Sequence, residues 1–152
     1  MSASRLAKFK ALAPSERRLV IAAFALLPLV ALGIRAVGLR RVQAFLAPSA
    51  PNARPASAAS LERARRIAGL VAIAARHGAY RAKCLPLSLT LQRLLQSEGI
   101  PSELRVGVRK DGHALVAHAW VEHDGAPLLE ARGVHERFAA FDEALAATRG
   151  GE

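Results

Sequence analysis

The residues best suited to chemistry are a lone cysteine and a histidine carried by a predicted strand. Cys84 is the only cysteine of the chain, and it opens an amphipathic helix predicted over 85–98. Lys83 and Arg81 flank it, and neighbouring cations and a helix N-terminus both favour thiolate over thiol. His118 begins the run His-Ala-Trp-Val-Glu at 118–122. The pair is typical of a cysteine nucleophile and its base, although a lone cysteine is more often a small buried hydrophobe.

Capping and helix-breaking residues mark the ends of the elements that must position Cys84 and His118. Gly99 ends the helix that Cys84 opens, and Pro101 prevents it from resuming. An earlier helix is predicted from Ser60, as its cap, to about His77. Alternation predicts a hairpin of two strands over 103–109 and 113–122, followed by a third over 126–130. The apolar residues Phe138, Phe141 and Leu145 suggest a last short helix that closes the core.

A third residue, an acid to orient the histidine, depends on the turn at 123–125. If all three residues form the loop, Glu130 falls directly opposite His118. A two-residue Asp124-Gly125 turn would instead set Ala131 opposite His118 and move Glu130 to the other face. Glu122 shares the face of His118 but lies about 13 Å along the strand. Glu130 is chosen as the acid, and this choice requires the three-residue loop.

Over about the last 90 positions, these motifs resemble the transglutaminase-like peptidases of lasso-peptide biosynthesis. The resemblance is carried by the Cys84 helix start, by Gly99-Ile100-Pro101, by the strand to Val108, and by the run from His118 to Glu122. It implies an α+β fold with a transglutaminase-like (papain-like) cysteine peptidase core, helices packed on a small antiparallel sheet. Carried over residue by residue, it implies Cys84, His118 and Glu130 as the catalytic triad, although an aspartate is more usual at the third position.

The resemblance also implies a substrate and partners. In that family the peptidase removes the leader from a ribosomally made precursor, and a separate cyclase then closes a macrolactam on the freed core amine. Nothing before residue 60 supplies the three strands of a winged-helix leader-recognition module. A separate leader-recognition protein is therefore expected, beside the lasso precursor peptide and the macrolactam cyclase.

Two other function classes stay open at the level of sequence. A transglutaminase-like fold can transfer an acyl group to an amine instead of water, as an acyltransferase or amidase on another peptide, and residue identities do not separate these outcomes. A non-catalytic, membrane-associated scaffold protein is the other alternative. An unreactive, fully buried Cys84 would favour the scaffold.

Composition sets further limits on function. The 152 residues suit one domain, and a single cysteine excludes an internal disulfide. The five histidines lack metal-ligand spacing, and a surface or capping role is expected for the four other than His118. No phosphate-binding glycine loop occurs, so no cofactor is expected. The net charge of +10 comes without interleaved stacking aromatics, which makes nucleic acid a poor fit.

The N-terminal third is read as a separate hydrophobic and basic helical segment over 1–50. A linker rich in Pro, Ala and Ser follows at 51–59, and the peptidase domain takes 60–152. The apolar run Leu19 to Ile34 has sixteen uncharged residues, fewer than the roughly 20 that a membrane span needs, and Pro28 predicts a kink or break. Flanking arginines suit an anionic membrane surface. A cytoplasmic protein, at most peripheral to the inner face of the membrane, is expected.

Overall fold

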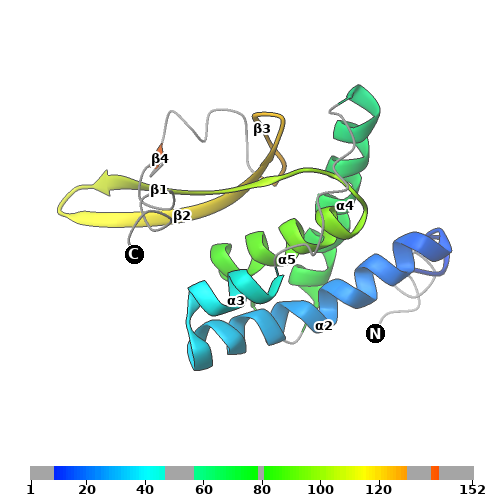
Figure 1. The fold of residues 1–152 in the computed structure, drawn as a ribbon, viewed down its shortest axis with the longest axis horizontal. Coiled ribbons are helices and arrows are strands. Elements are labelled where there is room, and N and C mark those ends of the chain that lie inside the picture. The colour runs from blue at the N-terminus through cyan, green and yellow to red at the C-terminus, as the bar shows by residue number, and fades with distance from the viewer. Residues whose placement is uncertain (1–8, 47–56, 79–80, 130–137, 141–152) are drawn as a thin grey trace.

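Helices gathered on one side of a small antiparallel sheet make up the fold, which is seen here in a computed structural model (Figure 1). The structure describes residues 9–46, 57–78, 81–129 and 138–140. The helices are α2 Pro14–Val37, α3 Leu39–Leu46, α4 Ala58–His77 and α5 Cys84–Ser97. The strands are β1 Glu103–Asp111, β2 Ala114–His123, β3 Ala126–Pro127 and β4 Ala139–Ala140, in the order β3-β2-β1-β4. This arrangement confirms the predicted α+β class.

The α5 helix begins and ends where its sequence predicts. Lys83 is the N-cap, Cys84 is the first helical residue, and Pro86 lies in the first turn, where its missing N–H costs nothing. Gly99 takes a left-handed φ of 72°, and the Ile100 N–H donates to the Leu95 carbonyl at 2.9 Å. This bond satisfies a carbonyl of the last helical turn, which would otherwise have no donor.

The α4 helix begins earlier than predicted. Ser57 is its N-cap, and Ser60 is the reciprocal residue of a capping box, with Ser60 N–H to Ser57 Oγ at 3.1 Å and Ser57 N–H to Ser60 Oγ at 2.9 Å. The prediction that Ser60 caps the helix was therefore wrong, because two serines three residues apart can each fill either place in the box. The helix also takes Ala58 and Ala59 from the predicted linker, and it ends at His77, as predicted, with Gly78 as its C-cap.

The α2 helix is continuous through Pro28, so the predicted break does not occur. It is 24 residues long, and an 18-residue window of it has a mean hydropathy of 2.3, which by length and composition would suffice to cross a membrane. Only 28% of that window is buried. Its inner stripe of Leu19, Val20, Ala23 and Leu27 packs into the main core.

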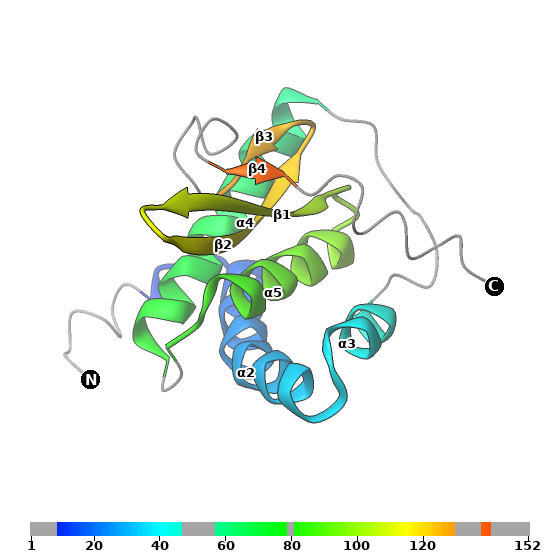
Figure 2. The ribbon, with the colours of Figure 1, turned by 90° about the vertical axis from the view of Figure 1, so that its left-hand side faces the viewer.

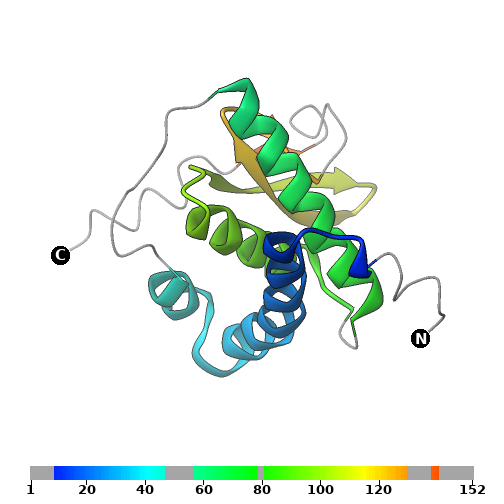
Figure 3. The same cartoon turned by 90° about the vertical axis from the view of Figure 1, so that its right-hand side faces the viewer.

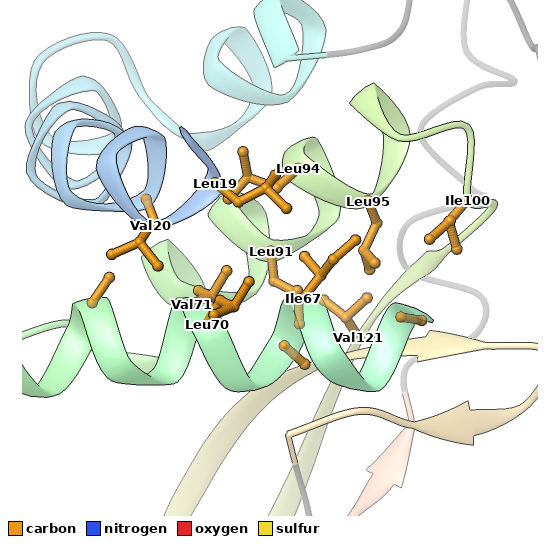
Figure 4. Close-up of a cluster of buried hydrophobic side chains, with 14 of the residues drawn as sticks. Leu19, Val20, Ile67, Leu70, Val71, Leu91, Leu94, Leu95, Ile100 and Val121 are labelled. Carbon is orange, nitrogen blue, oxygen red and sulfur yellow. The ribbon is translucent and has the colours of Figure 1, made fainter. Parts of the chain in front are cut away.

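That core joins three helices to the sheet (Figure 4). Ile67, Leu70 and Val71 of α4 meet Leu91, Leu94 and Leu95 of α5, with Val121 of β2 and Ile100 completing the cluster. Figure 3 shows α2 beside α4 and α5, at the bottom of this arrangement. The N-terminal segment thus shares one core with the predicted peptidase unit.

The sheet confirms the hairpin and corrects the turn after it. β1 and β2 pair from Glu103↔Glu122 to Asp111↔Ala114, with Gly107 opposite His118. β2 and β3 pair as His123↔Ala126, so the connection is the two-residue turn Asp124-Gly125, and the expected three-residue loop was wrong. Both turn residues have positive φ, 51° and 72°, as in the type I′ turn that matches strand twist.

The chain near Phe138 also differs from expectation. Ala139 and Ala140 form a short strand that pairs with Val108 and Gly107 at the outer edge of β1 (Figure 2), where a closing helix was predicted. Phe141 and Leu145, the other residues of that predicted helix, lie outside the described residues.

Candidate active site

Cys84 lies in a cavity of about 770 Å³ between the C-terminal half of α2 and the start of α5. Its side chain is half-buried. The described lining is apolar over much of its extent and includes three cations, Arg35, Arg81 and Lys83. The residues that line it are Pro28, Ala31, Leu32, Ile34, Arg35, Arg81, Lys83, Cys84, Leu85 and Pro86. A partly exposed thiol at a helix N-terminus among cations is the environment in which cysteines react.

One buried hydrogen bond fixes α5 against β2. The Ser88 hydroxyl donates to the Ala119 carbonyl at 3.0 Å, and both residues are buried. Ser88 lies one helical turn after Cys84, and Ala119 directly follows His118. The bond therefore holds the segments that carry the predicted nucleophile and base next to each other.

His118 faces the side of the sheet away from the main helical core. Along β2, Ala119 and Val121 are buried toward the helices, so alternation turns His118 and Trp120 to the opposite face. There the imidazole lies parallel to Trp120, at 6.1 Å between ring centroids and 16° between planes, and 5.1 Å from the Phe138 ring. Gly107 stands opposite His118 on β1 and presents no side chain to it.

The structure thus brings the segments of Cys84 and His118 together but not their side chains. Within the described ranges, no hydrogen bond joins Cys84 Sγ to the His118 ring. Catalytic hydrogen bonds are often long without substrate, so the dyad stays a prediction.

Glu130, the predicted third residue, lies outside the described residues. The two-residue turn at Asp124-Gly125 removes the register argument that set Glu130 opposite His118. Its assignment is left resting on the family resemblance.

Sequence reasoning placed Glu122 on the same face as His118 but missed that its carboxylate is buried. Glu122 is 4% exposed, and it accepts hydrogen bonds from Trp120 Nε1 at 2.5 Å and Arg105 Nε at 3.4 Å. Trp120, itself 1% exposed, is a core aromatic whose indole N–H is satisfied by this carboxylate. The alternation of β2, which places Glu122 two residues from Trp120 on one face, was the available signal.

His123 is a buried structural histidine, whereas a surface or capping role was expected. It is 1% exposed, with Nδ1 2.6 Å from the Pro101 carbonyl and Nε2 2.8 Å from Ser60 Oγ. The carbonyl can only accept, so Nδ1 carries a proton. His123 therefore ties the first turn of α4 to the end of β2 and to the loop that leads into β1.

No group of three His, Cys, Asp or Glu side chains within the described part of the chain could hold a metal ion.

No curated protein and no solved structure matches the chain. The sequence model described as the transglutaminase-like superfamily, in contrast, matches residues 26–141, from the middle of α2 to just past β4. Because that match covers most of the 152 residues, the chain belongs to the transglutaminase-like superfamily.

Proposed function

We propose that this protein is a cysteine peptidase that cleaves the leader from a ribosomally synthesised lasso-peptide precursor. Membership of the transglutaminase-like superfamily supports the coarser part of this proposal, a papain-like cysteine peptidase or acyltransferase activity. The observation that carries it is Cys84, half-buried at the first residue of α5 and open to a cavity with three cations. The lasso substrate rests on the resemblance of the motifs around Cys84 and His118.

The proposed reaction is acyl transfer to water. The Cys84 thiolate attacks the scissile carbonyl, the C–N bond breaks, and His118 supplies a proton to the departing amine. Water, deprotonated by His118, then hydrolyses the thioester and releases the leader. For these steps the imidazole must reach the start of α5, whereas in this structure it lies on the other face of β2, beside Trp120 and Phe138.

Two further groups complete this mechanism. The first N–H groups of a helix have no intrahelical acceptor, and the Cys84 N–H is the proposed oxyanion donor. Glu130 is the proposed orienting acid. Replacing it by glutamine should lower turnover while leaving activity above that of Cys84→Ala, since an orienting carboxylate matters less than the nucleophile.

The proposed partners follow from the same resemblance: the precursor, a separate leader-recognition protein and a macrolactam cyclase. Cleavage of the precursor should be slow for the isolated peptidase and accelerated by a protein that binds the leader. Equal rates with and without that protein would contradict this part of the proposal.

The proposed location is cytoplasmic, with peripheral contact to the membrane. The exposed apolar residues of α2 support this location, among them Ile21, Leu29 and Leu32.

The direct test is cleavage of a lasso precursor followed by mass spectrometry. Wild-type protein should release the intact core, and Cys84→Ala should release none while keeping its circular dichroism spectrum and melting temperature. Retained cleavage by purified Cys84→Ala would exclude the mechanism. A labelled primary amine in the same reaction separates hydrolysis from acyl transfer, because a conjugate of leader and amine as the main product would favour the acyltransferase alternative.

A further inference from the structure

The cavity at Cys84 has a composition that the peptidase mechanism does not use. Chemistry at the thiol needs no apolar wall from α2, yet Pro28, Ala31, Leu32, Ile34 and Arg35 of that helix line the cavity. At about 770 Å³ the cavity falls within the range of small-ligand sites, about 300–1,000 Å³. A space of this size beside the thiol could hold a short peptide segment.

Its charge has one sign. Arg35 comes from α2, and Arg81 and Lys83 come from the segment before α5, while no acidic residue is among the described lining. All three cations are exposed. In the parts of the chain that the structure describes, the ion pairs use Arg63, Arg65, Arg66, Arg105 and Arg109 and none of the three lining cations. The cavity therefore combines an apolar wall with cations whose charge no described side chain balances.

From this we infer that the cavity binds a peptide segment in which an apolar residue stands beside a carboxylate. The apolar side chain would contact Leu32 and Ile34, and the carboxylate would pair with Arg35, Arg81 or Lys83. The inference rests on the proposed function for its reason to bind a peptide, and it gives the N-terminal helix a role as the wall of a substrate site. Charge complementarity raises the local concentration of such a segment.

The first test measures the potential at the thiol without any turnover. The same thiolate attacks iodoacetate and iodoacetamide and displaces iodide from each, so the ratio of the two rates cancels the degree of ionisation and reports the charge around Cys84. Because the chain has one cysteine, every adduct is assigned. The ratio should exceed that of glutathione several-fold at low salt and fall as salt screens the cations.

Two variants test whether the cations around the cavity cause the high ratio. A unit charge several ångströms away in nearly aqueous surroundings changes the rate of the reaction with the anionic iodoacetate by about threefold. Arg35→Glu changes the charge by two units, so it should lower the ratio of the two rates about tenfold. Arg35 lies in a different helix from Cys84, which excludes an effect on the α5 terminus itself. Lys110→Glu makes the same change at an exposed site far along β1 and should leave the ratio near wild type. Arg81→Glu serves as the second test if Arg35→Glu fails to fold.

The second test asks whether a peptide occupies the cavity. The capped tripeptide Asp-Leu-Leu should protect Cys84 from iodoacetamide, and Asn-Leu-Leu, Asp-Ser-Ser and Lys-Leu-Leu should protect it at least several-fold less. Protection by Asp-Leu-Leu should weaken in Arg35→Glu and persist in Lys110→Glu. Equal protection by all four peptides, or an alkylation ratio equal to that of glutathione, would overturn the inference.

Anionic lipid is the competing occupant. Protection of Cys84 by phosphatidylglycerol vesicles but by no peptide would replace the peptide site with a membrane contact and would overturn the inference. Neither test requires catalysis, so protection without leader cleavage would reject only the proposed peptidase activity. Cleavage without selective protection would reject only the peptide site.

Discussion

Replacing Glu122 by glutamine perturbs the buried polar contact beside His118. The carboxylate is 4% exposed and accepts from Trp120 Nε1 at 2.5 Å and from Arg105 Nε at 3.4 Å. Glutamine keeps the shape and one acceptor oxygen, but it removes the charge and directs an N–H₂ group toward one of the two donors. One of the two donors then loses its bond to residue 122.

The cost can be worked from these two contacts. A hydrogen bond to a charged group contributes about 1.5–3 kcal/mol to stability. The Arg105 contact is long, and Arg105 also pairs with Glu103 at 3.0 Å, so its share is small. The Trp120 bond therefore dominates, and the variant should lose about 2 kcal/mol. For a domain of about 150 residues that corresponds to a fall in Tm of about 4–8 °C.

Thermal and urea unfolding of Glu122→Gln, followed by circular dichroism, measures this loss. Glu103→Gln is the matched control, because Glu103 pairs with the same arginine but its side chain is 72% exposed. The control should stay within about 0.5 kcal/mol of wild type. A Glu122→Gln protein equally close to wild type would refute the assignment of the buried carboxylate as a stabilising acceptor. Unchanged stability with lost cleavage would instead identify Glu122 as the orienting acid in place of Glu130.

Three further predictions concern the core, pH and the membrane. Ile67 is a fully buried core residue, and Ile67→Ala should lower the free energy of unfolding in urea by about 2–5 kcal/mol. Ile73 is 45% exposed, and Ile73→Ala should lower it far less. Equal losses of stability would contradict the packing. The hydrogen bonds that Glu16 accepts from Arg66 and from the Ala13 N–H lower the pKa of Glu16. The stability that Glu16→Gln removes should therefore be present at pH values above the unfolded pKa of about 4.3. It should vanish as the pH falls through the lower folded pKa. A difference from wild type that grows with acidity would show the opposite shift. High salt or carbonate should extract the protein from membranes, and resistance to both would indicate that α2 is inserted.

The elements that were predicted well are those with local signals. Gly99, which has a left-handed φ, ends α5 as predicted, and alternation along β2 predicted that His118 and Glu122 share one face. The turn after β2 shows the limit of such reasoning. Asp124-Gly125 and a three-residue loop are both compatible with the residues, and the difference of one position shifts every partner on the next strand.

The features that were not predicted depend on contacts between distant segments. Ala139 pairs with Val108 across the edge of the sheet, and no local pattern marks two alanines as a strand. The burial of His123 comes from Ser60 and Pro101, each more than twenty residues away. The apolar run of α2 was evident, but the packing that makes it a wall of the Cys84 cavity is a property of the assembled fold.

The claim that Cys84 is the nucleophile is tested most directly by trapping the acyl-enzyme. Precursor is mixed with peptidase, the reaction is quenched in acid within the first turnover, and the intact mass is measured, followed by peptide mapping. The account predicts a thioester adduct with the mass of the leader acyl group on the peptide that contains Cys84, absent in Cys84→Ala and weaker in His118→Ala. Precursor cleavage by a wild-type protein that never carries this adduct, or an adduct on any other residue, would contradict it.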